Sequence, residues 1–321
     1  MSIARLSLLC LGLLVGGRVP LQAGQTAVGG DLVAYGLVAR ATSPIVVDGR
    51  LDEFDWQLAE QINGFERILN DYDRIRHPTR ARMLWDDQGF YFAFACQDAD
   101  IWAIYDGEDE ALWEEEVVEV FIDPDGDARR YLELEVNPLN TVVDLLIYQV
   151  ESGFDSSRDW DIAGLQTAVQ VVGTVSDSLA ADQGWTVEIA IPWSAMADSV
   201  GGGGKPQPGD QWRLNLYRIE RRGGRALKAA IDTLNAQARP LMAQSAALHA
   251  QADSLAAAGA SPGRSQRRRL AQLEEELAPI AAQLKPLHER YNEQTEYTAW
   301  SETYQRGFHH PQRFGVVEFA R

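Results

Sequence analysis

Short runs of alternating apolar and polar residues, separated by Gly, Pro, Asn and Asp, fill the chain from about residue 44 to 222. Successive side chains of a strand point to opposite faces, so this pattern indicates half-buried β-strands joined by tight turns. The expected strands are 45–47, 79–85, 90–96, 117–123, 131–137, 142–148, 165–175, 185–191 and 212–220. The pattern predicts an all-β fold, an antiparallel β-sandwich of the jelly-roll or immunoglobulin-like kind.

The clearest hairpin is LWEEEVVEVFIDPDGDARRYLELEVN, residues 112–137. Its alternation places Glu119 on one face of the first strand and Glu135 and Asn137 on the same face of the return strand. If the turn is centred near Asp127, Glu119 lies opposite Glu135, where like charges repel. We therefore expect this face to be open and hydrated, with its carboxylates serving a function.

A different pattern begins after Gly224, where apolar residues recur at alternating spacings of four and three in two stretches. Two such heptad stripes, separated by AAAGASPGR, predict an antiparallel coiled-coil hairpin of two α-helices, inserted over 225–292. Because the stripes can bury their apolar residues against each other, we expect the β domain to fold without the hairpin. The β pattern resumes in 293–321.

The N-terminal residues have the layout of a secretory signal peptide. Arg5 precedes an apolar run from Leu6 to Val15, and the small residue Ala23 offers a cleavage position. The expected organisation is a signal peptide (1–23), a linker (24–43), a β-sandwich (44–224), the helical hairpin and a closing β segment (293–321). No later run reaches the roughly 20 apolar residues of a membrane-spanning helix. We expect an exported protein located in the periplasm, outside the cell or on the cell surface.

Composition narrows the range of partners. The chain has 47 acidic and 29 basic residues, a formal net charge of -18. This charge argues against nucleic acid and anionic membranes, and leaves neutral or cationic ligands. Cys10 lies in the predicted signal peptide, so Cys96 has no partner for an internal disulfide and the core must supply stability.

Several segments in series resemble the family 9 carbohydrate-binding modules. They are PIVVDGRLDEFDWQLAE, ARMLWDDQGFYFAFACQDADI, LWEEEVVEVFIDPDGD, YLELEVNP, DQGWTVEIAIPW, GDQWRLNLYRIER and AWSETYQRGFHHPQRFGVVEF. They occur in family order and cover 44–222 and 296–321. The resemblance implies a β-sandwich that holds the end of a sugar chain between two aromatic side chains, above polar residues of the sheet.

Carried over by position, the resemblance implies Trp113 and Phe308 as the aromatic walls and Glu119 and Asn137 as polar contacts. Phe308 replaces a tryptophan of the known sugar binders, and Glu135 replaces an arginine. The expected function is that of an exported, non-catalytic saccharide-binding protein with a role in polysaccharide catabolism.

Two other functions remain open. The hairpin could make this a structural or adaptor protein that self-associates or binds a protein partner through its helices. Paired carboxylates could also serve a glycoside hydrolase, although no segment is left over for a catalytic domain. Finally, Asp123, Asp125 and Asp127 alternate in DPDGD as calcium ligands can, so this turn is either a structural calcium site or a plain solvated turn.

Overall fold

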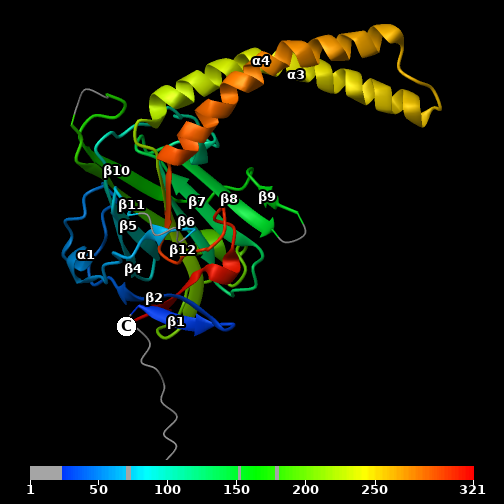
Figure 1. Ribbon diagram of the computed structural model, residues 1–321. Coiled ribbons are helices and arrows are strands. Elements are labelled where there is room, and N and C mark those ends of the chain that lie inside the picture. Colours follow the sequence, from blue (N-terminus) through cyan, green and yellow to red (C-terminus); the bar gives the residue numbers. More distant parts are fainter. Residues whose placement is uncertain (1–23, 70–73, 151–152, 178–180) are drawn as a thin grey trace, which may run out of the picture.

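The computed structural model describes residues 24–69, 74–150, 153–177 and 181–321. The predicted signal peptide lies outside these residues. The described strands form one sheet of 14 strands, from which two long helices project as an arm (Figure 1).

The strands are β1 (Gln25–Val28), β2 (Asp31–Arg40), β3 (Glu66–Arg67), β4 (Thr79–Trp85), β5 (Gly89–Gln97), β6 (Val117–Asp123), β7 (Tyr131–Val136), β8 (Val142–Gln149), β9 (Asp155–Ser157), β10 (Gln166–Val172), β11 (Gly184–Pro192), β12 (Gln211–Glu220), β13 (Glu296–Ala299) and β14 (Gly315–Phe319). Eight of these match predicted strands to within about three residues, because their alternation is regular. The expected strand over residues 45–47 is wrong, since that segment is irregular. Short helices α1 (Phe54–Leu58) and α2 (Trp193–Ala197) lie outside the arm.

The sheet has two halves that share one core. The order is β10-β11-β5-β4-β2-β14-β12-β6-β7-β8-β9. Phe92 of β5 and Val187 of β11 belong to the same buried cluster as Val120 of β6 and Leu216 of β12. Full burial of such side chains stabilises the fold by about 1.5–3 kcal/mol each. Cys96 lies in this core, where burial raises the pKa of its thiol to about 12.

The N-terminal segment corrects one prediction. Residues 24–43, expected to be a linker, contain β1 and β2. Strand β2 pairs in parallel with β14 and with β4, so it joins the two halves of the sheet. Val33 and Val38 are buried, which ties this strand to the core.

The second face of β6, β7, β8 and β12 carries a separate apolar cluster. Phe121, Tyr131 and Tyr217 from the strands pack there with Phe308 and Phe314 from the C-terminal segment. Part of this face is therefore covered by protein. It is the face on which the candidate site lies.

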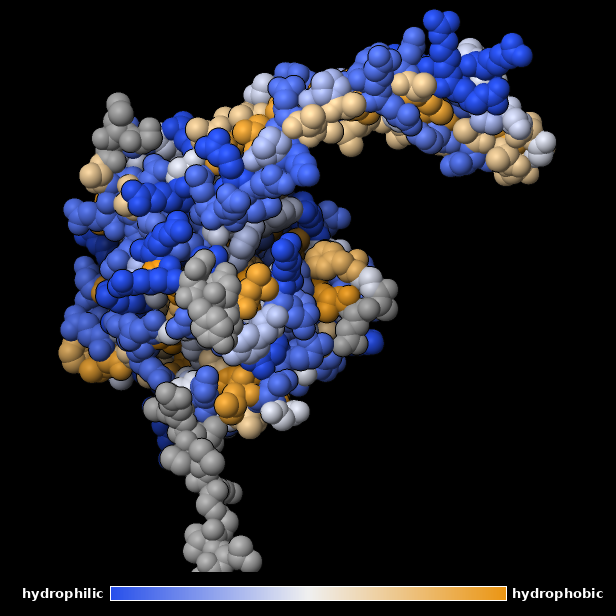
Figure 2. Space-filling model, in the orientation of Figure 1, coloured by the Kyte–Doolittle hydropathy of each residue, from blue (hydrophilic) through white to orange (hydrophobic). Residues whose placement is uncertain are grey.

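The arm consists of α3 (Gly224–Ala257) and α4 (Arg264–Gln294), close to the predicted boundaries. Its heptad positions run from Leu227 to Leu255 in α3 and from Leu270 to Tyr291 in α4, and all except Leu255 are buried or half-buried. Figure 2 shows apolar side chains running along the arm among hydrophilic ones. No described helix combines the length and apolar character that crossing a bilayer requires.

The base of the arm is not independent of the β domain. Leu227, Ile231 and Tyr291 form a buried cluster with Trp102, which precedes β6 in the chain. Trp102 donates a hydrogen bond from Nε1 to the carbonyl oxygen of Arg221 over 2.9 Å. The expectation that the hairpin buries its apolar residues only against itself is therefore wrong for its base, because the first turns of α3 and the last turns of α4 pack on the body.

Candidate functional site

A cavity of about 830 Å³ opens on the second face of the sheet. Its lining comes from β3, β6, β7, β8, β9, β12 and β13, the segments 113–114 and 306–309, and the base of α3 and α4. Residues far apart in the sequence therefore meet here, and the inserted arm supplies one side. Asn235 and His288 are among the residues of the arm that line the cavity.

The two predicted aromatic walls both line this cavity but differ in exposure. Trp113 is half-buried in the 3-10 turn Leu112–Glu114. Phe308 is only 7% exposed and stacks on Tyr217, with ring centroids 4.1 Å apart and planes 10° apart. One face of Phe308 is thus used by the protein, so Trp113 offers the larger free aromatic surface.

The predicted opposition of Glu119 and Glu135 is confirmed, since the two residues are partners in the register of β6 and β7. Glu133 lies on the same face, and all three line the cavity. Oxygen atoms of the three side chains lie within 4.8 Å of one another. We call Glu119, Glu133 and Glu135 the carboxylate floor.

The carboxylate floor is buried, which corrects the expectation of an open, hydrated face. The three side chains are exposed by 2%, 5% and 1%. Burial raises the pKa of Glu133 to about 8, and it raises the pKa of Glu119 and of Glu135 well above the ordinary value, with their mutual repulsion adding to the effect. At neutral pH the floor therefore retains protons that exposed glutamates would have released.

Asn137 lies outside the cavity. Its side-chain nitrogen donates to the carbonyl oxygen of Tyr105 and to Glu115, and its side-chain oxygen accepts from the backbone of Leu139 and Thr141. These bonds shape the turn between β7 and β8 and leave the amide no capacity for a ligand. The strand alternation that placed Asn137 on the sheet face did not predict these hydrogen bonds.

Sequence reasoning missed several lining residues. Glu133 could have been found, because it alternates with Glu135 on the same face of β7. Arg158 and Arg221 carried no local signal. Arg221 is buried and donates to the carbonyl oxygen of Trp113 over 2.8 Å, which fixes the backbone beneath the indole.

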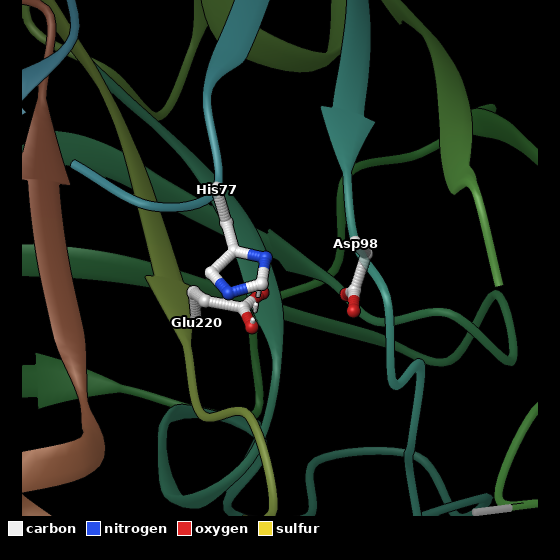
Figure 3. Close-up of side chains that lie close together, drawn as sticks. All are labelled: His77, Asp98 and Glu220. Atoms are coloured by element: carbon white, nitrogen blue, oxygen red, sulfur yellow. Dashed lines mark ion pairs between the residues drawn. The ribbon is translucent and has the colours of Figure 1, made fainter. Parts of the chain in front are cut away.

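A second buried polar cluster lies away from this cavity. Figure 3 shows His77 turned toward Glu220, while Asp98 projects from the end of β5. The Nδ1 atom of His77 is 3.7 Å from Oε1 of Glu220. Arg218 lies 3.0 Å from Asp98 and pairs with Glu220, so this cluster contains its own cation. A structural ion pair accounts for it.

The DPDGD turn is compact. Asp123, Asp125 and Asp127 offer ligand atoms within 4.8 Å of one another. Asp123 is buried, and its Oδ1 has no hydrogen-bond partner among the described residues. Oxygen donors of this kind suit a hard cation such as calcium, which takes about 6–8 oxygen ligands, so the three aspartates would be part of a fuller set.

The sequence pattern of the carbohydrate family 9 binding domain-like proteins matches residues 47–228, more than half of the chain. Among solved structures, the chain is similar to a "putative carbohydrate-binding protein" from Bacteroides uniformis, with a TM-score of 0.50 and 15% identity over 89% of this chain and 97% of that one. At that identity the likeness shows the fold alone.

Two further structures are of a family 9 carbohydrate binding module from Caldicellulosiruptor kristjanssonii, one with cellotriose and one with glucose. Each has a TM-score of 0.45 and 14% identity, covering 89% of this chain and 93% or 96% of the other. No curated protein matches the chain.

Proposed function

This chain belongs to the carbohydrate family 9 binding domain-like family, and from that premise we propose that it holds a saccharide in the cavity above the carboxylate floor. The family is one of non-catalytic carbohydrate-binding modules. We accordingly assign the cavity to binding and not to cleavage. Trp113 would stack on the ring of the sugar, with Phe308 at the opposite side.

One observation carries this proposal: an accessible aromatic surface and buried acceptors line the same cavity. A pyranose presents C–H groups on its faces and hydroxyl groups around its edge. Removing the C–H surface from water against Trp113 contributes about 25 cal/mol per Å². Hydroxyl groups can donate to the carbonyl oxygens of Glu119 and Glu135, and a hydrogen bond between uncharged groups contributes about 0.5–1.5 kcal/mol.

The arm supports a second part of the proposal, that the insertion belongs to the binding site. Asn235 of α3 and His288 of α4 line the cavity beside the strands. Lys228 donates to the hydroxyl of Tyr105 over 2.9 Å and lies 3.1 Å from Glu114, so the base of the arm is held against the segment that carries Trp113. An adaptor role through self-association or a protein partner would then belong to the distal part of the arm.

We further propose that the protein is exported and that it binds a structural calcium ion. The N-terminal sequence supports cleavage near Ala23 and a location outside the cytoplasm, in keeping with polysaccharide catabolism. The Asp123, Asp125 and Asp127 side chains would hold a structural calcium ion in the β6–β7 turn. Its role there would be to neutralise three converging carboxylates.

The experiment that tests the proposed function is a glycan array probed with residues 24–321, followed by calorimetric titration of each glycan that binds. We expect at least one glycan to bind with a Kd below about 1 mM, which corresponds to about -4.1 kcal/mol. Glu119→Gln should weaken that binding about tenfold, and chromatography should show the glycan uncleaved. An array without binders would refute the proposal, and cleavage by the parent but not by Glu119→Gln would make the carboxylates catalytic.

A further inference from the structure

The carboxylate floor differs from the other buried acidic cluster of this protein in one respect. Arg218 forms ion pairs with both Asp98 and Glu220 within the fold. In the described part of the chain, no salt bridge reaches Glu119 or Glu135. Buried carboxylates are normally paired with a cation, whereas the floor has none paired with Glu119 or Glu135 and retains protons instead.

Arg158 and Arg221 attract the floor and partly offset the effect of burial on the pKa of its carboxyl groups, but neither forms a salt bridge with it. His309 is nearest, with Nε2 3.6 Å from Oε2 of Glu133, but burial lowers the pKa of its ring to about 4, so it is neutral at pH 7. Arg221 hydrogen-bonds to Trp113, Thr295 and Tyr297.

Lys228, at the base of the arm, also lines the cavity. It is engaged by both carboxylate oxygens of Asp232 over 2.7 Å, as well as by Tyr105 and Glu114. Its charge is therefore directed away from the floor.

Two oxygen atoms of the floor point to an external partner. Oε2 of Glu133 and Oε2 of Glu135 are fully buried, and no described residue outside the floor donates a hydrogen bond to either, although the two carboxyl groups hydrogen-bond to each other. Both side chains are more than nine-tenths buried and line the cavity. A buried acceptor without a donor is costly, so a ligand that donates to both would be bound tightly.

We propose that the carboxylate floor receives the ammonium group of a cationic saccharide, so that the ligand of this site is an amino sugar. This inference rests on the proposed function and specifies its ligand class. An ammonium group carries three N–H donors on one compact atom, which match the three converging carboxyl groups once these release protons to the solvent. A hydroxyl group carries one donor and leaves the other acceptors unsatisfied.

The surroundings favour an organic ammonium group over a metal ion. Trp113, Phe121 and Phe308 line the cavity beside the floor, and aromatic faces attract both cations and the C–H groups of a sugar. Calcium takes about 6–8 oxygen ligands, but the floor offers three carboxylates among aromatic rings. The net charge of -18 also attracts a cationic chain to the protein as a whole.

Three β-1,4-linked hexasaccharides that differ only at C2 test the inference: the glucosamine oligomer, the N-acetylglucosamine oligomer and the glucose oligomer. Calorimetric titration at pH 6.5 should show the glucosamine oligomer binding at least tenfold more tightly than the other two. Glu133→Gln and Glu135→Gln should each reduce that affinity at least tenfold. Glu133→Gln, at the one residue of the floor to which no hydroxyl contact is assigned, should change the affinity for any neutral glycan found on the array by less than about threefold.

Glu274→Gln on the exposed face of α4 is the matched control, since it removes the same charge outside the cavity. It should leave the affinity for the glucosamine oligomer unchanged. Thermal melting of each variant shows whether it is folded. If the glutamine variants unfold, Glu133→Asp replaces them, because it keeps the carboxyl group on a shorter side chain. This variant should weaken the binding of the glucosamine oligomer and leave the binding of neutral glycans unchanged.

The outcomes separate the two proposals. If neutral glycans bind in a Trp113-dependent manner but the glucosamine oligomer gains no advantage, the saccharide site stands and the ammonium inference fails. If no glycan of any kind binds, both fail. If calcium or zinc alone binds, and Glu133→Gln abolishes that binding while the glucosamine oligomer does not bind, the floor is a metal site and the inference is overturned.

Discussion

The guanidinium carbon of Arg158 lies 4.8 Å from the centre of the Trp113 ring, so a cation covers part of the aromatic surface that lines the cavity. Arg158 is exposed, and an exposed contact of this kind stabilises by about 0.5–1 kcal/mol. A sugar that stacks on this face must displace the guanidinium. Arg158→Ala should therefore strengthen saccharide binding about two- to fivefold in a calorimetric titration. Weaker binding would show instead that Arg158 contacts the ligand.

Trp113→Ala should weaken saccharide binding by about tenfold or more, which corresponds to about 1.4 kcal/mol. The indole is half-buried at the cavity, so its loss should lower the melting temperature little. Titration of the same glycan against both proteins measures the effect. Phe54→Ala is the control, because Phe54 is a 65% exposed aromatic outside the cavity and its removal should leave affinity unchanged. Equal affinity in Trp113→Ala and the parent would place the ligand elsewhere.

Two deletions of the arm should differ in effect. Replacing residues 243–276 by a short Gly-Ser linker keeps Leu227, Ile231 and Tyr291 against Trp102, so the protein should melt cooperatively and bind saccharide. Replacing residues 225–292 exposes Trp102 and opens the cavity, and should lower the free energy of unfolding by about 3 kcal/mol or more.

Urea unfolding followed by tryptophan fluorescence compares the two deletions. Equal stability would show that the base of the arm contributes nothing to the body. A change from oligomer to monomer in the shorter deletion, seen by light scattering, would support association through the distal arm.

Stability should fall as pH rises from 6.5 to 8. Burial raises the pKa of Glu133 to about 8, while an unfolded glutamate has a pKa of about 4.3, so the folded protein binds a proton that the unfolded chain has released. Each such carboxyl lowers the free energy of unfolding by up to about 1.4 kcal/mol per pH unit. Asp123, whose pKa burial raises to about 7, acts in the same direction.

The other titratable groups near Glu133 do not reverse the expected fall in stability between pH 6.5 and 8. Glu119 and Glu135 titrate in the same sense, and Tyr131, whose pKa is raised by burial, keeps its proton throughout. The lowered pKa of His309 destabilises the fold only below about pH 6.5, where the unfolded histidine gains a proton. Urea titrations of the parent and of Glu133→Gln should show a flatter slope in the variant. Stability that rises with pH would contradict the buried carboxylate floor.

Calcium should raise the melting temperature if the DPDGD turn holds the ion. A ligand that binds only the folded state stabilises by mass action, by about 2.7 kcal/mol at a concentration 100 times Kd. Differential scanning calorimetry with excess calcium and with a chelator measures the shift. Asp125→Ala should abolish it, whereas Asp253→Ala on the exposed arm should not. A shift that survives Asp125→Ala would assign the ion to other ligands.

The sequence by itself determined the features that depend on local periodicity. Alternation predicted β6 and β7, and the position of DPDGD fixed the register that sets Glu119 opposite Glu135. Heptad spacing predicted both helices of the arm. In each case the interacting positions are close in the chain, so residue pattern and geometry are directly linked.

Only the tertiary structure decided what covers each face. Strand β2 pairs in parallel with β14 across almost the whole length of the chain, and local patterns do not specify so distant a partner. Phe308 and the base of the arm line the cavity together with the carboxylate floor, although the sequence places them far from β6 and β7. Because the pKa of a carboxyl follows from its solvation and its neighbouring charges, the change from a hydrated face to a proton-retaining floor became visible only when these segments were brought together.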